Sequence, residues 1–151
     1  MGSINDLFGS MGISATGMSA EQRRLEASAR NLSVLHVAAR PGQETVQLRS
    51  VRLREKGTLD SEDAQFSEFM SGRTAEGVAS EDVDTKAPVR LQYEPGNPLA
   101  DENGMVSYPA VDFLGEMVQM MQSSRAFEAN VTAYTEARTM IQRAMEIGRG
   151  A

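Results

Sequence analysis

The sequence lacks cysteine and tryptophan and contains a single histidine, His36. Without cysteine there is no disulfide, no thiolate metal site and no thiol nucleophile. A lone histidine with no G-x-S-x-G motif gives no nucleophilic triad, and no glycine-rich segment ends in the Gly-Lys-Ser/Thr of a phosphate-binding loop. We therefore predict that the protein is not an enzyme and that it binds no metal and no cofactor.

Long apolar runs and an excess of basic residues are also missing. No run of 18 apolar residues exists, so we predict no membrane insertion. The N-terminus lacks the basic start and continuous apolar stretch of a cleavable signal peptide. The formal net charge of −6 argues against a nucleic-acid partner, because binding to duplex phosphates needs a basic face.

Residues 4–35 have the apolar period of an amphipathic helix. The apolar positions seven residues apart are Ile4, Met11, Met18, Leu25 and Leu32. Gly9, Gly12 and Gly17 weaken this helix, each by about 1 kcal/mol relative to alanine. A Pro-Gly pair after residue 40 ends the helical pattern.

Residues 112–147 predict a second and longer helix. Its apolar stripe comprises Phe113, Met117, Met120, Phe127, Val131, Tyr134, Ile141 and Met145. Asp112 is a suitable N-cap, and Gly148 is expected to stop the helix. At 1.5 Å per residue the helix would be roughly 54 Å long, which is more than one small domain covers by itself. This stripe therefore requires partners.

The apolar period changes between the two helices. Residues 46–53 and 89–93 alternate as strands do, and the Pro-Gly and Asn-Gly pairs within residues 94–104 predict an ordered loop leading to another short strand. Residues 60–84 hold eight acidic residues against one basic residue. We interpret that segment as a solvated acidic loop.

These patterns predict an α+β fold in which long N- and C-terminal helices form an antiparallel coiled-coil pair with a small β-rich insert between them. Residues 1–40 would be the N-terminal helical segment of an inner coiled-coil domain. Residues 41–110 would form a small β-rich outer domain that carries the acidic loop 60–84. Residues 111–151 would supply the C-terminal helix of the inner domain.

Two groups of acidic residues are candidate sites of chemistry. Asp101-Glu102-Asn103-Gly104 resembles part of a calcium loop, but Asp112 stands where such a loop needs its twelfth-position glutamate, so we interpret it as a turn. The carboxylates of Glu81, Asp82 and Asp84 have no histidine partner for acid/base work.

Two segments resemble the axial proteins of the bacterial flagellum. The first helix carries Ala29-Arg30-Asn31-Leu32, and the second reads EMVQMMQSSRAFEAN over residues 116–130. Between them, YEPGNPLADENG at residues 93–104 is similar to the proximal-rod members of that family in particular. The resemblance is continuous over residues 87–147. It departs from the family pattern after Leu32, which leaves the end of the first helix open.

The resemblance implies a structural subunit of the flagellar basal body. Such a subunit polymerises with copies of itself and related rod subunits into the proximal rod, which crosses the periplasm, transmits torque and surrounds the export channel. Further implied partners are basal-body ring components and the flagellar type III export apparatus, with export occurring without a cleaved signal peptide. The copy number, the neighbour at each face and the role of residues 60–84 stay open.

The predicted assembly seam consists of the apolar positions of both helices together with Asn31 and Asn130. By resemblance, these two amides are candidates for hydrogen bonds between the terminal helices, because a buried amide fixes register. Two alternatives to a rod subunit stay open. A soluble coiled-coil adaptor or chaperone binding partner helices would form an oligomer of small fixed number, and a small acidic enzyme would need a concave pocket around its carboxylates.

Overall fold

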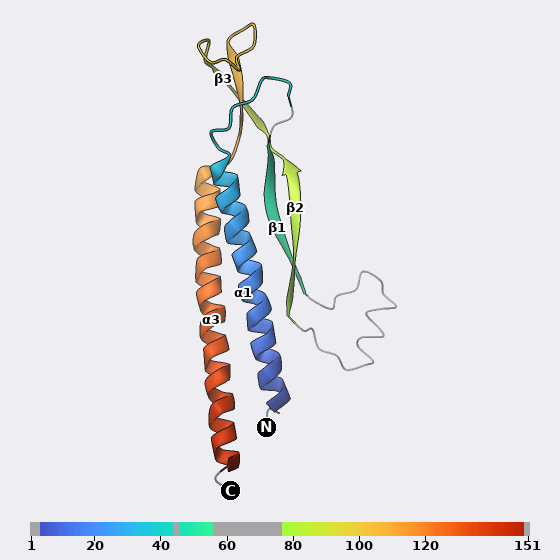
Figure 1. Ribbon diagram of the computed structural model, residues 1–151, viewed down its shortest axis with the longest axis vertical. Helices are drawn as coiled ribbons and strands as arrows, with labels where there is room; N and C mark the ends of the chain where they lie inside the picture. Colours follow the sequence, from blue (N-terminus) through green and yellow to red (C-terminus); the bar gives the residue numbers. More distant parts are fainter. Residues whose placement is uncertain (1–3, 44–45, 56–76, 150–151) are drawn as a thin grey trace, which may run out of the picture. The chain divides into compact units, whose positions relative to one another are not determined.

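The computed structural model describes residues 4–43, 46–55 and 77–149 (Figure 1). Along the chain the elements are α1 (Ile4–Ser33), β1 (Gln47–Glu55), β2 (Val78–Lys86), β3 (Val89–Tyr93), β4 (Met105–Pro109) and α3 (Phe113–Arg149). Two long helices with strands between them in sequence confirm the predicted α+β class. Neither described helix combines the length and apolarity needed to cross a lipid bilayer.

The chain divides into two compact units, which are described separately. Unit 1 contains Met1–Arg23, Arg52–Glu81 and Ser123–Ala151, and unit 2 contains Arg24–Val51 and Asp82–Gln122. Each unit holds part of both helices, whereas the predicted domain boundaries lie at residues 40 and 110. The division into an inner helical domain and an outer β-rich domain stays a prediction.

The ends of the two helices follow from local hydrogen bonds. Helix α1 ends at Ser33, two residues before the predicted end, and the Leu35 amide then bonds Leu32 O at 3.3 Å in a tighter turn. The Asp112 carbonyl accepts the first bond of α3, from the Glu116 amide at 3.0 Å, as an N-cap residue does. The predicted stop at Gly148 is wrong, because this glycine has no positive φ and α3 continues to Arg149.

Strands β3 and β4 form an antiparallel hairpin in unit 2, which confirms the predicted pair of strands. Val89 lies opposite Pro109, and Tyr93 lies opposite Met105. In the connecting loop, Asp101 Oδ1 accepts the backbone N–H groups of residues 103 and 105 at 2.9 and 2.8 Å. Gly104 has a φ of 75°, a conformation that glycine adopts at little cost. The Asp101 carboxylate therefore builds a turn, as the sequence analysis expects.

Strand β4 lies at the centre of unit 2. Val106, Ser107 and Pro109 are fully buried. Ser107 and Ala39 exchange two backbone hydrogen bonds, of 2.8 and 2.9 Å, at the edge of β4 away from β3. Both edges of β4 are thus paired, and β3 is the outer strand of this group.

Strands β1 and β2 pair in a separate two-stranded sheet. Strand β1 confirms the strand predicted over residues 46–53. Strand β2 was not predicted, and the interpretation of residues 60–84 as an acidic loop is wrong for residues 78–84. Residues 60–76 lie outside the described residues. The acidic residues of β2 are compatible with a strand because arginines of β1 lie beside them.

Candidate assembly surfaces

The most buried face of α1 is lined by small side chains instead of the predicted apolar ones. In unit 1 this face holds Ser14, Gly17 and Ala20, and in unit 2 it holds Ala27, Ser28 and Asn31. Members of each set recur three or four residues apart, so they share one side of the helix. Small side chains allow a neighbouring element to approach the helix backbone closely.

Gly17 lies against Asn130 of α3 within unit 1. A methyl group on Gly17 would place its Cβ 2.8 Å from Asn130 Oδ1, which is closer than an ordinary contact. Asn130 Nδ2 donates to Ala126 O of its own helix at 2.9 Å. Asn130 therefore meets α1 by close packing on a glycine. The predicted hydrogen bond from Asn130 to the N-terminal helix stays a prediction.

Asn31 joins three elements within unit 2. Its Nδ2 donates to Arg49 O of β1 at 2.8 Å and to Glu116 Oε1 of α3 at 2.7 Å, and its Oδ1 accepts the Arg49 N–H at 2.8 Å. The side chain is only 4% exposed. The bond to Glu116 connects the two terminal helices, as the sequence analysis expects of Asn31. The pairing with Arg49 was not anticipated.

The predicted seam residues differ widely in burial. Met11, Met18, Leu25, Leu32, Met120, Phe127, Asn130 and Tyr134 are half-buried, Ile141 is buried, and Phe113, Met117, Val131 and Met145 are exposed. The side chain of Ile4 lies outside the described residues. The predicted seam therefore contains both side chains that are at least half-buried in the single chain and side chains that are exposed.

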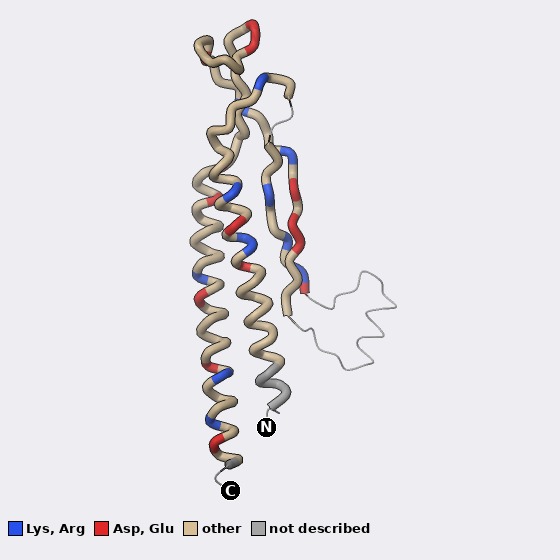
Figure 2. The backbone as a smooth tube through the Cα atoms, in the orientation of Figure 1, with Lys and Arg blue, Asp and Glu red and all other residues tan. Residues whose placement is uncertain are grey.

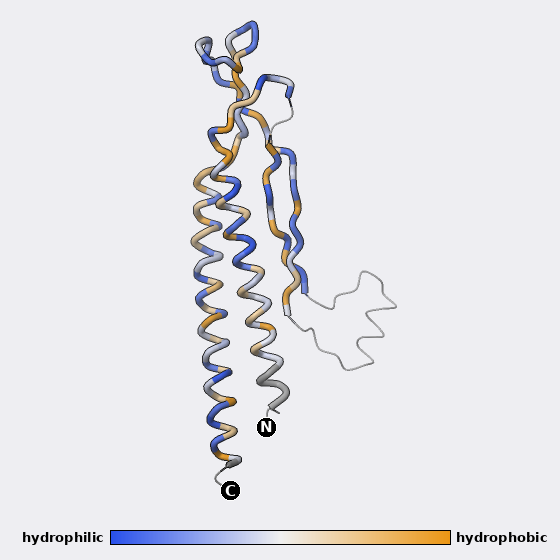
Figure 3. Tube along the Cα trace, in the orientation of Figure 1, coloured by the Kyte–Doolittle hydropathy of each residue, from blue (hydrophilic) through white to orange (hydrophobic). Residues whose placement is uncertain are grey.

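Several large apolar residues at the start of α3 in unit 2 are exposed. In Figure 3 this part of the tube is coloured mostly on the hydrophobic side of the scale. The exposed residues, here called the α3 stripe, are Phe113, Leu114, Met117, Val118 and Met121. Leu114 is 73% exposed. At 100° per residue, the stripe is centred roughly 130° around the helix from Glu116, whose side chain bonds Asn31. This part of α3 therefore turns one face toward α1 and leaves a different, apolar face uncovered.

The predicted seam contains only Phe113 and Met117 of the α3 stripe. Leu114, Val118 and Met121 are outside it because they lie off the single seven-residue repeat that defines the seam. The missed residues carry a signal of their own, since they form a second apolar row with spacings of four and three residues.

Strand β3 exposes a second apolar row in unit 2, here called the β3 stripe. Val89, Leu91 and Tyr93 alternate along one face, and Tyr93 is 67% exposed. The hairpin is flanked by hydrogen bonds at Pro88 O and at the Glu94 N–H, so the even-numbered residues of β3 bond toward β4. The backbone groups of the three stripe residues consequently point away from β4. The β3 stripe offers apolar side chains and an outward strand edge together.

Opposite charges face one another along β1 and β2 (Figure 2). Arg49 bonds Asp84 through Nε–Oδ1 at 3.0 Å and Nη2–Oδ2 at 3.3 Å, and lies 3.7 Å from Asp82. Further along β1, Arg54 lies 3.9 Å from Glu81, so the two strands run in opposite directions. The hydrogen bond from Arg49 is the main cause that lowers the pKa of Asp84 below its ordinary 3.8. Each of these three carboxylates therefore lies beside an arginine of β1 and forms a cross-strand ion pair.

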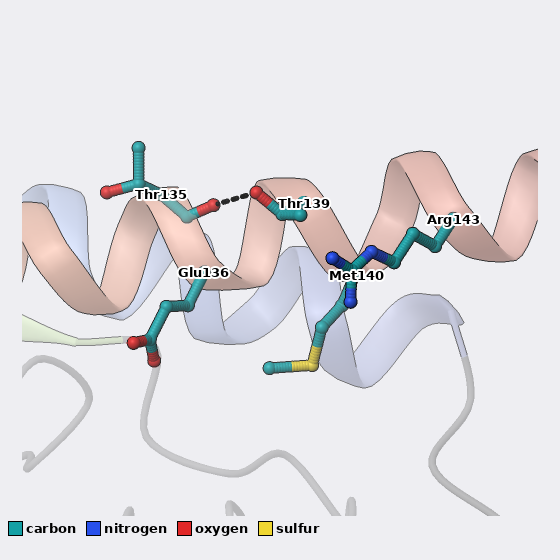
Figure 4. A pocket seen from close by; sticks show the side chains of 5 residues that line it. All are labelled: Thr135, Glu136, Thr139, Met140 and Arg143. Carbon is teal, nitrogen blue, oxygen red and sulfur yellow. Dashed lines mark hydrogen bonds between the residues drawn. The ribbon is translucent and has the colours of Figure 1, made fainter.

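A surface hollow of about 320 Å³ lies along α3 in unit 1. Its lining residues are Thr135, Glu136, Thr139, Met140 and Arg143 (Figure 4). Thr139 Oγ1 donates to Thr135 O at 2.9 Å, so this hydroxyl serves the helix itself. Within residues 4–43, 46–55 and 77–149, no three His, Cys, Asp or Glu side chains gather closely enough to hold a metal ion.

Comparisons with known proteins give these surfaces a context. Residues 102–147, which include β4 and the α3 stripe, match the family described as flagellar basal body rod FlgEFG protein C-terminal. The chain is 31% identical to the flagellar basal-body rod protein FlgC of Salmonella typhimurium, over 91% of this chain and 94% of that protein. It is 32% identical to the FlgC of Bacillus subtilis, over 94% of this chain and 98% of that protein.

A third relative, the flagellar basal-body rod protein FlgC of Borreliella burgdorferi, is 25% identical over 95% of this chain and 99% of that protein. These names describe structural parts of the flagellar rod and not enzymes, and they do not favour a soluble adaptor or chaperone. The chain therefore belongs to the FlgC family of flagellar basal-body rod proteins and is a structural subunit of that rod.

Proposed function

We propose that this chain polymerises with copies of itself and related rod subunits into the proximal rod, where it crosses the periplasm, transmits torque and surrounds the export channel. The observation that carries the proposal is the α3 stripe, an uncovered apolar surface on a helix whose other side faces α1. Burial of a Leu, Phe or Met side chain contributes about 1.5–3 kcal/mol, so covering this stripe favours association strongly.

The helices would form an antiparallel coiled-coil pair in that rod. Two contacts support this pairing, Gly17 with Asn130 in unit 1 and Asn31 with Glu116 in unit 2. The second contact lies fourteen residues further along α1 and fourteen residues earlier along α3. Equal steps in opposite directions are the register of antiparallel helices, and fourteen residues are two heptads.

The pair would be the inner domain, built from residues 1–40 and 111–151, with residues 41–110 outside it. The assembly seam would comprise the seam residues predicted from the sequence, and we add to them Leu114, Val118 and Met121 of the α3 stripe. A head-to-tail contact repeated by a helical operator produces a tube, whereas a closed two-fold dimer does not elongate.

The remaining partners follow from membership of the family. The rod subunit would contact basal-body ring components at the ends or sides of the rod. It would reach the periplasm through the flagellar type III export apparatus, as membership of the rod family implies.

Leu114→Asp tests the assembly surface. In a bacterium whose own rod gene is deleted, we expect this variant to give no rods in electron micrographs and no swimming, because subunit contact would bury an unpaired carboxylate. The purified variant should keep the far-ultraviolet circular dichroism of the native protein, because Leu114 is mostly solvent-exposed in the single chain.

Leu114→Met is the matched control, because it keeps an apolar side chain of similar volume at the same position. It should restore rods and swimming. Normal rods in the Leu114→Asp strain would show that the α3 stripe stays outside the subunit contacts and would contradict the proposal.

A further inference from the structure

The Asn31 amide forms part of the backbone pairing of β1. It exchanges two hydrogen bonds with Arg49, accepting from the N–H and donating to the C=O, in the way that a residue of a neighbouring strand would. The other amide hydrogen goes to Glu116 of α3. All three bonds lie within unit 2 and measure 2.7–2.8 Å.

Only an amide of this length fits all three partners. A carboxylate in its place has no hydrogen to donate, and the serine hydroxyl has a single one on a shorter side chain. On the α3 side, Glu116 Oε2 is buried and has no hydrogen-bond partner in the part of the chain that is described. Asn31 thus donates to one oxygen of a carboxylate whose other oxygen is buried without a partner there.

The contacts continue from Arg49 into the second strand of the sheet. While the Arg49 backbone pairs with Asn31, its guanidinium forms a two-bond pair with Asp84 of β2. One residue thus bonds the helix amide through its main chain and the neighbouring strand through its side chain. Glu116, Asn31, Arg49 and Asp84 form a continuous hydrogen-bonded series across four elements of unit 2.

We propose that Asn31 is a positioning residue that fixes β1 and the start of α3 onto the end of α1. It couples the β1–β2 sheet to the helices, so that a displacement of the sheet is resisted by the helices. This coupling goes beyond assembly into the rod. Its consequence for torque transmission rests on the proposed function, but the coupling itself is a property of the single chain.

Asn31→Ala, in the purified full chain, tests the pairing with β1. Amide hydrogen exchange should become faster at Arg49 N–H by about tenfold or more, because that hydrogen loses its acceptor. The Ala39 N–H, which bonds Ser107 O in the same unit, is the internal control and should change less. Unchanged protection of the Arg49 N–H in Asn31→Ala would overturn the proposal. An equal loss of protection at the Arg49 and Ala39 N–H groups, found in Asn31→Ala and also in Asn31→Asp at every pH, would overturn it too.

Asn31→Asp supplies a signature that simple loss of packing would not give. The new carboxylate would face Glu116 from α3 and Arg49 from β1. The Arg49 guanidinium is already paired with Asp84 and Asp82 of β2. On α1 itself, the preceding residue is Arg30. Two carboxylates in contact raise the pKa of the pair above the unfolded value. The folded state then binds a proton more tightly, so the penalty is largest at pH 7 and diminishes as the pH falls toward 5.

At pH 7 we expect the midpoint of thermal unfolding of Asn31→Asp to fall by about 5 °C or more, with most of the loss recovered near pH 5. Adding Glu116→Gln to this variant should recover stability at pH 7, because the glutamine amide can donate to the introduced carboxylate. Asn103→Asp, in an exposed turn, adds the same charge and should leave the midpoint unchanged.

A loss in Asn31→Asp that is equal at pH 5 and pH 7, or that Glu116→Gln leaves unaltered, would overturn the positioning role. These measurements use the purified chain and do not require rods. A failure of the Leu114→Asp experiment would therefore leave them standing, and their failure would leave the rod assignment standing.

Discussion

Within unit 2, α1 buries Ala27, Ser28 and Asn31, whereas α3 leaves Phe113 and Leu114 uncovered. The usual distribution is the reverse, with large apolar side chains inside and small polar ones outside. The same contrast recurs in the strands of this unit, where Ser107 is buried and Tyr93 is exposed.

The contrast separates two sources of stability. Close approach over small residues and a few specific hydrogen bonds hold the single chain, as at Gly17 and Asn31. The large apolar side chains of the α3 stripe contribute little to the single chain because they are exposed to water. Their burial is left to association, which stabilises the folded state through mass action. We therefore expect the single chain to have a small free energy of unfolding and to gain stability when it assembles.

The close contacts should be the most sensitive part of the molecule, and Gly77→Ala should show the largest effect. Gly77 has a φ of 109°, and an added Cβ would overlap Thr16 Oγ1 of α1 within unit 1. That hydroxyl also accepts the Val78 N–H at 3.0 Å. We expect the free energy of unfolding in urea to fall by about 2–5 kcal/mol, from backbone strain and steric overlap together.

Gly42→Ala is the matched control for that loss. Gly42 also has a positive φ, of 84°, but an added Cβ would meet no atom within 4 Å. Its substitution should cost only the backbone term, about 1–2 kcal/mol. Equal losses in the two variants would show that the contact of Gly77 with Thr16 contributes nothing.

A pair of exchanges between serine and leucine tests the contrast directly. Ser123 of α3 is fully buried, so Ser123→Leu should lower the free energy of unfolding by about 1–3 kcal/mol through overpacking. Leu114→Ser, in the α3 stripe, should change it by less than about 0.5 kcal/mol because the side chain is mostly exposed. If the added leucine stabilised the chain and the added serine destabilised it, the division between the two surfaces would be wrong.

Alanine substitutions at two glycines of α1 should also change the free energy of unfolding by different amounts, and this difference should be smaller. An added Cβ on Gly12 would meet no atom within 4 Å, so Gly12→Ala should stabilise the single chain by about 1 kcal/mol through helix propensity. Gly17→Ala gains the same propensity but forces Asn130 to move, so its net gain in urea unfolding should be smaller. Equal gains would show that the approach of α3 to Gly17 is loose.

Local patterns in the sequence were sufficient for the helices and the hairpin. The seven-residue repeat predicts α1 and α3 to within two residues at each end, and alternation with turn residues predicts β3 and β4. Each of these signals lies within one short segment, where period and turn chemistry act. Gly148 misled because a glycine at a helix end stops the helix only when it takes a positive φ.

Strand β2 and the Asn31 pairing depend on residues far apart in the sequence. Strand β2 has few apolar residues to alternate, and its acids appear solvated until the arginines of β1 are placed beside them. The sequence does contain a signal for this pairing. Residues 49–54 include arginines and residues 81–84 include acidic residues, and opposite charges favour pairing of neighbouring strands. Asn31 bonds the backbone of Arg49, which leaves no trace in the type of residue at position 49.

The smallest effect concerns the charged contacts of β1 and β2, which belong to neither the close contacts nor the apolar stripes. Asp84 has a pKa lowered below 3.8, chiefly by its hydrogen bond to Arg49. A carboxylate with a lowered folded pKa favours folding above its unfolded pKa, and that contribution is lost as the pH falls through the folded pKa. The relevant window therefore lies below about pH 4.

Urea unfolding of the native chain and of Asp84→Asn across pH 2–7 measures this contribution. The native chain should be slightly more stable at pH 7, and the difference should close as the pH falls below about 4 and Asp84 is protonated. Because both side chains of the ion pair are about a third exposed, added salt should also reduce the difference. A difference that persists at pH 2 would mean that Asp84 acts through packing and not through its charge.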